Sequence, residues 1–409
     1  MKKALNNIRV LDLSRILAGP FCTQMLGDLG AEIIKVEKPG TGDDTRAWGP
    51  PFVKDAEGED TSESAYYLSC NRNKKSIAVD LRIPEGQEVV RKLIAQSDIV
   101  IENFKVGGLK KYGLAYDDLK DVHPGLIYCS ISGFGQTGPL AAEPGYDFLA
   151  QGMAGLMACT GEPDGAPMKA GVALGDIMTG LNAAAGILAA LHHRSETGKG
   201  QHIDLALTDC MLAAMTNIAQ YYLTSGENAP RLGNAHSTIV PYQTFEAADG
   251  HVVLAVGNDT QFARFAAFAG HSEWAEDARF ARNSARVKNR DVLVPMIAQV
   301  MARETMAHWI EGLRDIDVPC GPVNTMDKAF KTEQIQARGM EIEMTHALSR
   351  APVHLVGSPL KLSETPVSYD APPPLCGQHT GEVLEKLLGM PEADIQKLEA
   401  QNIIQRRRF

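Results

Sequence analysis

Short apolar runs alternate with helical patterns over the first 131 residues, and this alternation restricts the possible folds more than any other feature. Residues 9–13 and 32–37 have strand patterns with a helix between them, and residues 76–80, 98–102 and 126–131 continue the series. A strand, a helix and a strand within about thirty residues indicate a βαβ unit, whose strands are parallel. The sequence therefore predicts an α/β fold with an open, Rossmann-like sheet.

The glycine-rich motifs that bind nucleotides are missing from this region. The first strand leads into Ser14–Pro20, which contains no G-x-G-x-x-G pattern, and the chain has no Walker A sequence. Chemistry that depends on NAD, FAD or a P-loop therefore has no support.

The strand and helix series is interrupted near residues 225–230, where Gly, Asn and Pro gather. We expect a large Rossmann-like domain in residues 1–225, a smaller α/β domain in residues 226–327, and a linker that returns to the large domain in residues 328–409. In the smaller domain the patterns predict strands at 239–240, 244–245 and 251–256, and helices at 260–269 and 291–314.

The composition excludes several classes of protein. Hydrophobic residues make up 44% and charged residues 22% of the chain, as in ordinary globular proteins. The net charge of −10 argues against a nucleic-acid partner. Seven cysteines without a C-x-x-C pair read as free thiols. No signal peptide is visible, and the apolar stretch Leu181–Leu191 is too short to cross a bilayer. We expect a cytoplasmic protein without a membrane partner.

Asp176 is the first candidate for chemistry. A short apolar run ends in Gly175-Asp176, and a helical pattern begins at once. The free N–H groups and the dipole of a helix N-terminus favour an ionised carboxylate, which can act as a nucleophile or base. An ordinary N-cap aspartate is the alternative that spacing alone leaves open.

Other candidate residues give weaker evidence of function. The sequence Gly145-Tyr146-Asp147 is a second candidate, but by itself it favours a turn with a solvated carboxylate. The basic run at residues 71–76 could hold a polyphosphate together with nearby cations, or could be a solvated loop. The eleven histidines show no metal-site spacing, so no metal is expected.

Taken together, segments along nearly the whole chain resemble the class III CoA-transferase family. They occur in the same order as in the family. The whole set is therefore a much more specific sign of the family than any single segment. The matching stretches are Val10–Leu13, Leu17–Pro20, Gly30–Glu37, Gly42–Arg46, Glu102–Phe104, Gly133–Pro139, Gly145–Asp147, Gly175-Asp176, Thr197–Gln201, Gly321–Val323 and Gly377–Thr380.

The resemblance implies a mechanism and a partner. Asp176 matches the catalytic aspartate, which in this family forms an anhydride and then a CoA thioester, with no cofactor beyond CoA itself. The family fold is an interlocked homodimer. Within the family, residues 42–53, 71–79 and 235–243 are most similar to members that use succinyl-CoA and glutarate. The expected substrates are therefore an acyl-CoA and a small carboxylic or dicarboxylic acid.

The resemblance also assigns further positions, residue by residue. Those matching CoA contacts are Arg15, Ile16, Leu17, Ala18, Lys38, Val79, Arg82, Asn103, Phe104 and Lys111. Those matching the acyl pocket are Arg46, Trp48, Tyr146 and Asp147. A dicarboxylate needs an anchor for its distal carboxylate, and we expect Arg46 to supply it with His236 or Ser237.

Departures from the family pattern argue against two activities found in the family. Formyl-CoA transferase has Gln at the position of Leu17 and a run of glycines that this chain lacks. Racemases of the family place His where Tyr146 stands, and a tyrosine with a pKa of about 10 accepts protons poorly. An acyl-CoA racemase or isomerase is the alternative enzyme, and a non-enzymatic CoA-binding protein is the third possibility.

Overall fold

A computed structural model describes residues 3–407, and the chain forms two compact units. The larger unit contains residues 1–154, 170–216 and 334–409, and the smaller contains residues 155–169 and 217–333. The small unit thus includes residues 155–169, a segment that the sequence pattern places in the large domain.

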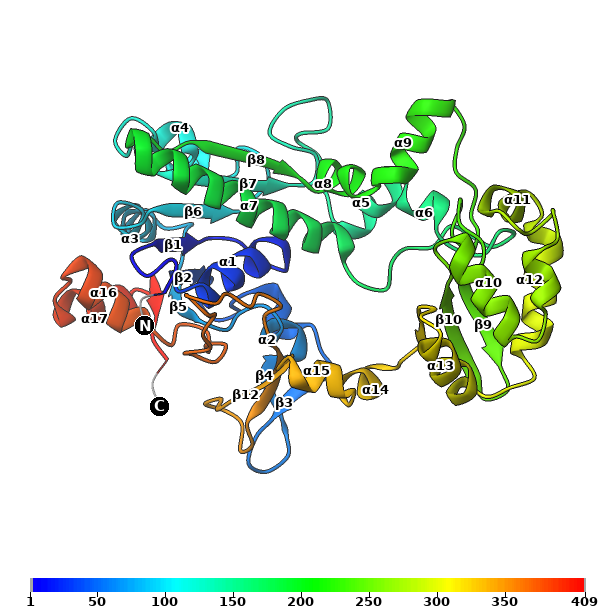
Figure 1. The fold of residues 1–409 in the computed structure, drawn as a ribbon. Coiled ribbons are helices and arrows are strands. Elements are labelled where there is room, and N and C mark those ends of the chain that lie inside the picture. Colours follow the sequence, from blue (N-terminus) through cyan, green and yellow to red (C-terminus); the bar gives the residue numbers. More distant parts are fainter. Residues whose placement is uncertain (1–2, 408–409) are drawn as a thin grey trace. The chain divides into compact units, whose positions relative to one another are not determined.

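A seven-stranded sheet forms the centre of the larger unit (Figure 1). Its strand order is β14-β5-β2-β1-β6-β7-β8, and each strand is parallel to its neighbours except β14 at one edge. Counted along the chain, the six parallel strands lie in the order 3-2-1-4-5-6, which is the Rossmann order. The strands are β1 Arg9–Asp12, β2 Glu32–Glu37, β5 Lys74–Val79, β6 Ile99–Glu102, β7 Ile127–Ser132, β8 His202–Ala206 and β14 Ile404–Gln405.

Helices cover both faces of this sheet because the side chains of each strand alternate between the faces. Val10 of β1 joins a core with helices α1 and α7, whereas its neighbour Leu11 joins a core on the opposite face with α3, α16 and α17. The helices of this unit are α1 Ala18–Asp28, α2 Ala65–Leu68, α3 Pro84–Ile94, α4 Tyr116–Leu119, α5 Asp147–Met153, α7 Leu174–Thr197, α8 Leu207–Ala214, α16 Thr380–Leu388 and α17 Glu392–Ala400.

Two hairpins complete the larger unit. They pair β3 Phe52–Lys54 with β4 Asp60–Ser64, and β12 Glu341–Met344 with β13 Val353–Val356. The short helix α15 Glu333–Ala337 lies at the boundary between the units.

The smaller unit is built around a three-stranded antiparallel sheet in the order β11-β10-β9. Phe262, Phe265 and Trp309 are buried between this sheet and its helices. Its elements are α6 Leu156–Cys159, α9 Thr216–Ser225, β9 Tyr242–Ala247, β10 Gly250–Ala255, α10 Asp259–Phe268, α11 Asn283–Lys288, α12 Arg290–Met301, α13 Met306–Asp315, β11 Cys320–Pro322 and α14 Met326–Phe330.

The α/β class is confirmed, and two local predictions are wrong. Residues 239–240 form no strand, and the helix expected over residues 291–314 is two helices, α12 and α13. The Thr305 side chain accepts the N–H of His308, so it caps a second helix and ends the continuous pattern.

Helix α7 is longer than its apolar stretch suggests. Leu174–Thr197 has 24 residues and a mean hydropathy of 1.5 in its most apolar window, so by length and composition it could cross a membrane. The expectation that this region is too short is therefore wrong. Ala183, Ile187 and Ala190 are buried in the sheet core, and core helices of soluble proteins pass the same test.

Candidate active site

Two cavities lie where the sheet order reverses, between β1 and β6. The segments that follow these strands, Leu13–Leu17 and Asn103–Phe104, contribute to their walls. In open parallel sheets the carboxyl ends of the strands at this switch point are the usual ligand site.

The first cavity, of about 180 Å³, contains Asp176. It brings together predicted residues from four separate parts of the sequence. These are Arg15, Ile16, Leu17, Ala18, Asn103, Phe104, Tyr146, Asp147 and Asp176.

Asp176 is the third residue of α7 and lies within its first turn. The N-cap is Ala173, whose side chain makes no capping bond, so Asp176 is not the N-cap residue. Burial, followed by the negative charge of Asp147, raises the pKa of Asp176 to about 7. A carboxylate with this pKa is more basic, and a better nucleophile, than a solvated one.

Asp147 fixes the start of α7 from outside the helix. One carboxylate oxygen accepts the N–H of Gly175 at 2.7 Å, and the other accepts the side-chain amide of Gln151 at 2.7 Å. The Gly175 N–H is one of the free donors of the helix N-terminus, so Asp147 acts as the missing cap. The same carboxylate thus orients the first turn and raises the pKa of Asp176.

The loop after β1 is held in a strained conformation beside this cavity. Ile16 has a φ of +72°, which a β-branched residue rarely adopts. Its N–H lies 3.3 Å from both carboxylate oxygens of Asp43. The side chain of Asn103 accepts the N–H of Arg15 at 2.9 Å and donates to the Arg15 carbonyl at 2.7 Å. These bonds fix the loop against the end of β6.

Buried ion pairs support the loop from below. Lys35 contacts Asp43 at 2.8 Å and donates to the carbonyl of Ser14 at 2.8 Å, and Lys74 contacts Asp12 at 3.2 Å. Burial opposes ionisation of Asp43, but the Lys35 charge outweighs it and lowers the pKa of Asp43 to about 2. The Lys35–Asp43 pair beneath the loop therefore stays ionised at neutral pH.

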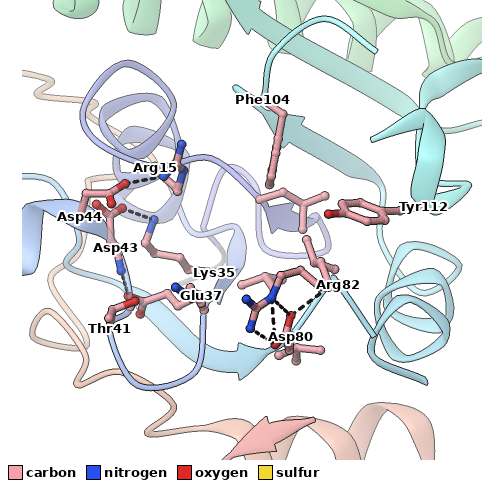
Figure 2. A pocket seen from close by; sticks show the side chains of 16 residues that line it. Arg15, Lys35, Glu37, Thr41, Asp43, Asp44, Asp80, Arg82, Phe104 and Tyr112 are labelled. Atoms are coloured by element: carbon pink, nitrogen blue, oxygen red, sulfur yellow. Dashed lines mark hydrogen bonds and ion pairs between the residues drawn. The ribbon is translucent and has the colours of Figure 1, made fainter. Parts of the chain in front are cut away.

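The second cavity, of about 330 Å³, has a rim of mixed charge, where Arg15 pairs with Asp44 at 2.5 Å (Figure 2). Arg15, Lys38 and Arg82 line it, and Arg82 forms a bidentate pair with Asp80 whose shortest contact is 2.6 Å. Val79 and Phe104 supply apolar wall. Arg15 and Phe104 line both cavities, so the two cavities share a wall.

Lys111 is not a lining residue of either cavity. Its amine lies 4.7 Å from the centre of the Tyr112 ring, and Tyr112 does line the second cavity. Lys111 therefore contacts a lining residue of this cavity without lining it itself.

Arg46 lines neither cavity, although its partner Glu37 lines the second one. Its guanidinium is 5% exposed, binds Glu37 at 2.8 Å and Glu63 at 2.5 Å, donates to the Pro374 carbonyl at 2.9 Å, and stacks on Tyr67. With these donors occupied, it has no group directed to an acceptor acid. The sequence could not reveal this because no local pattern shows that Glu37 and Glu63, 9 and 17 residues away, fold against Arg46.

Trp48 packs against Tyr66, a residue near the site that was not predicted from the sequence. Its ring is 46% exposed and meets the Tyr66 ring edge to face at 5.4 Å. Burial, then the charges of Asp176 and Asp147, raise the pKa of Tyr66 to about 12, so its phenol lies within reach of their field. Tyr66 stands in no recognisable motif, and no sequence signal could have singled it out.

The remaining candidates belong to the smaller unit. His236 accepts the N–H of Thr238 at 3.1 Å, and Ser237 lines a cavity of about 680 Å³ within that unit. Their part in binding an acceptor stays a prediction. Within residues 3–407, no group of three or more His, Cys, Asp or Glu side chains could hold a metal ion.

A family model described as CoA-transferase family III matches residues 5–380. The chain belongs to this family. It is 48% identical to a succinate–glutarate CoA-transferase of Agrobacterium fabrum, covering 94% of this chain and 96% of that one. It is 43% identical to the mouse succinyl-CoA:glutarate CoA-transferase, covering 98% and 91%. A CAIB/BAIF family protein from Brucella suis has a similar solved structure, with a TM-score of 0.85, 48% identity, and coverage of 95% and 100%.

Membership of CoA-transferase family III settles the class of the protein. It is an enzyme, a CoA-transferase, and the alternative of a non-enzymatic CoA-binding protein is set aside.

Proposed function

We propose that this CoA-transferase moves CoA from succinyl-CoA to a small dicarboxylic acid such as glutarate, through covalent intermediates on Asp176. The activities of its relatives support the substrates. The observation that carries the mechanism is the partly buried carboxylate of Asp176, whose pKa is raised, in a cavity that shares Arg15 and Phe104 with a second cavity lined by Lys38 and Arg82.

The two cavities match the two ends of an acyl-CoA. The phosphates are anions and suit the rim of Arg15, Lys38 and Arg82, because arginine and lysine are the usual phosphate ligands. The thioester end then passes Phe104 toward Asp176. No cofactor other than CoA is needed in this scheme.

The first half of the reaction loads CoA onto the enzyme. A carboxylate oxygen of Asp176 attacks the thioester carbonyl, the C–S bond breaks, and a mixed anhydride and CoA thiolate form. The thiolate then attacks the Asp176 carbonyl carbon. Succinate leaves with the bridging oxygen, and an aspartyl-CoA thioester remains.

The second half runs the same chemistry in reverse. The acceptor carboxylate attacks the aspartyl thioester, which gives a new anhydride and frees the thiolate. The thiolate attacks the acceptor's carbonyl carbon, so the new acyl-CoA forms and Asp176 is restored. Each step exchanges one activated acyl group for another, and the energy of the thioester is retained without ATP.

The acceptor's distal carboxylate needs a binding partner. Because the donors of Arg46 are occupied, His236 and Ser237 are the anchors that we retain from the sequence analysis. We also propose a cytoplasmic homodimer of the interlocked type. Seven free cysteines support the reducing compartment.

The test is a transfer assay with succinyl-CoA and glutarate that follows glutaryl-CoA by chromatography. We expect Asp176→Asn to lower kcat at least about a thousandfold, because the nucleophile is lost. Asp291→Asn is the matched control, since Asp291 is an exposed carboxylate in the first turn of α12. Full activity of Asp176→Asn would rule out the covalent mechanism, and transfer only to monocarboxylates would rule out the proposed acceptor class.

A further inference from the structure

Glu102 is a buried carboxylate at the end of β6 for which the catalytic scheme has no role. It is 7% exposed. Each of the other buried aspartates and glutamates among residues 3–407 forms an ion pair with lysine or arginine, and Glu102 forms none. A buried carboxylate without a cation is costly, so its position calls for an explanation.

The carboxylate of Glu102 holds the segment that divides the two cavities. Its Oε2 accepts the N–H of Phe104 at 2.8 Å. Asn103, between them, makes both hydrogen bonds to the Arg15 backbone, and Arg15 and Phe104 are the residues that line both cavities. One carboxylate therefore fixes the backbone from which the shared wall is built.

On its other side, Glu102 begins a polar chain across neighbouring strands. The Ser130 hydroxyl of β7 hydrogen-bonds the Glu102 carboxyl and lies 3.0 Å from Nε2 of His202 on β8. The His202 ring stacks on Tyr116 at 4.8 Å and is partly exposed. The chain therefore leads from the cavity wall to a partly exposed imidazole.

Glu102 titrates in the neutral range. Burial raises its pKa to about 7, although the bonds from Ser130 and the Phe104 N–H oppose that shift. Burial keeps Cys129 and Tyr128 neutral, since it raises the pKa of both well above neutrality, and it lowers the pKa of His202. The other titratable groups around this chain are Tyr116, Asp117, Asp118 and Asp204.

We propose that Glu102 is a positioning residue for CoA: its ionised carboxylate holds the Phe104 N–H and the wall between the cavities, and its protonation weakens CoA binding. A carboxylate accepts an N–H more strongly than a carboxylic acid does. The proposal rests on the proposed function, because it takes the two cavities as the CoA path.

The test is calorimetry of CoA binding to the full-length enzyme between about pH 6 and about pH 8, with wild type and Glu102→Gln. The amide accepts the Phe104 N–H but cannot titrate. We expect the ratio of the two Kd values to change about fivefold across this range, because a charge-assisted bond is replaced by a neutral one only in the wild type. The titrations of CoA and Asp176 cancel in that ratio.

Glu385→Gln is the control, because it makes the same change at an exposed position. A ratio that stays constant with pH for Glu102→Gln, as for the control, would overturn the proposal. Turnover gives a second readout: the variant should alter the KM for succinyl-CoA and leave kcat within about twofold, since Glu102 contacts no reacting atom.

Ser130→Ala tests the same idea through a neighbour. Its hydroxyl lowers the pKa of Glu102, so its removal should raise that pKa and move the pH at which CoA affinity falls to a higher value. An unmoved midpoint would contradict the proposal even if Glu102→Gln did not fold. If wild type binds CoA but transfers none, the proposed function fails, and the binding profiles still test the role of Glu102.

Discussion

At the residue scale, the proposed mechanism gives two carboxylates different tasks. Asp147 accepts hydrogen bonds from Gly175 and Gln151, so its charge is fixed in place. Asp176 shares its cavity, is partly buried, and has a pKa raised to about 7 by burial and by Asp147. Burial and the nearby negative charge of Asp147 both disfavour the ionised form of Asp176, so Asp176 holds its proton more tightly than a solvated carboxylate does.

The first prediction follows from this pair. Because Asp176 attacks as the anion, kcat should be high above about pH 7 and fall as pH decreases through the pKa of Asp176. Asp147→Asn keeps an acceptor for Gly175 but removes the charge, so the acidic limb should move to lower pH. Initial rates with saturating succinyl-CoA measure this limb. A limb that stays in place, or moves upward, would contradict the assignment.

The second prediction concerns Arg46, which we assign to stability. Arg46→Ala would leave Glu37 and Glu63 buried without their cation, so the free energy of unfolding should fall by about 3 kcal/mol. The KM for the acceptor should not change in molecules that remain folded. Denaturant unfolding and transfer kinetics measure the two effects. Unchanged unfolding together with a raised acceptor KM would return Arg46 to the substrate pocket.

At the element scale, α7 and α1 cross closely enough that the contact requires glycine. A Cβ on Gly180 would lie 2.7 Å from the Ala18 carbonyl oxygen and 3.0 Å from the Phe21 ring. Ala18 begins α1 and lines the Asp176 cavity, so this crossing positions one wall of the site. Helix α7 thus provides both the proposed nucleophile and the surface against which the start of α1 packs.

The third prediction compares two glycines of this helix. Gly180→Ala should destabilise the protein by about 2 kcal/mol, because the backbone of α1 must move. Gly186→Ala is the matched control: its Cβ would meet Ile203 at an ordinary 3.4 Å, so improved helix propensity should make it neutral or stabilising. Thermal unfolding of both variants measures the difference. Equal effects would mean that the crossing tolerates a methyl group.

Some helices and strands could be predicted from the sequence, and others could not. Strands β1, β2, β5, β6 and β7 follow from their apolar runs, and the parallel sheet follows from the helices between them. Strand β8, His202–Ala206, has an exposed charged residue and lies at a sheet edge, so its pattern is weak. The partners of Arg46 and the position of Tyr66 depend on tertiary contacts that no local pattern encodes.

At the scale of the whole molecule, apolar side chains on the larger unit remain exposed close to the site. Phe148 and Met153 of α5 are 61% and 53% exposed, and Tyr146 beside them is 63% exposed. Exposed apolar clusters of this kind mark interaction surfaces, and the proposed homodimer would cover this one.

The fourth prediction tests this assembly. Light scattering should give a mass twice that of one chain. Met153→Glu should shift the protein toward monomer and lower its activity, because a charge would be buried at the interface. Val122→Glu is the control, since Val122 is 68% exposed on another part of the unit. A wild-type monomer with full activity would contradict the proposal.

The measurement that tests the central claim most directly traces the carboxylate oxygen atoms of the acceptor. The enzyme is incubated with succinyl-CoA and glutarate labelled with ¹⁸O in its carboxylates, then digested, and the peptide containing Asp176 is examined by mass spectrometry. In the proposed cycle the acceptor's oxygen bridges the second anhydride and remains on Asp176 when the new thioester leaves. We therefore predict ¹⁸O in the Asp176 side chain. Transfer to glutaryl-CoA without label in Asp176 would show that this carboxylate is not the covalent carrier.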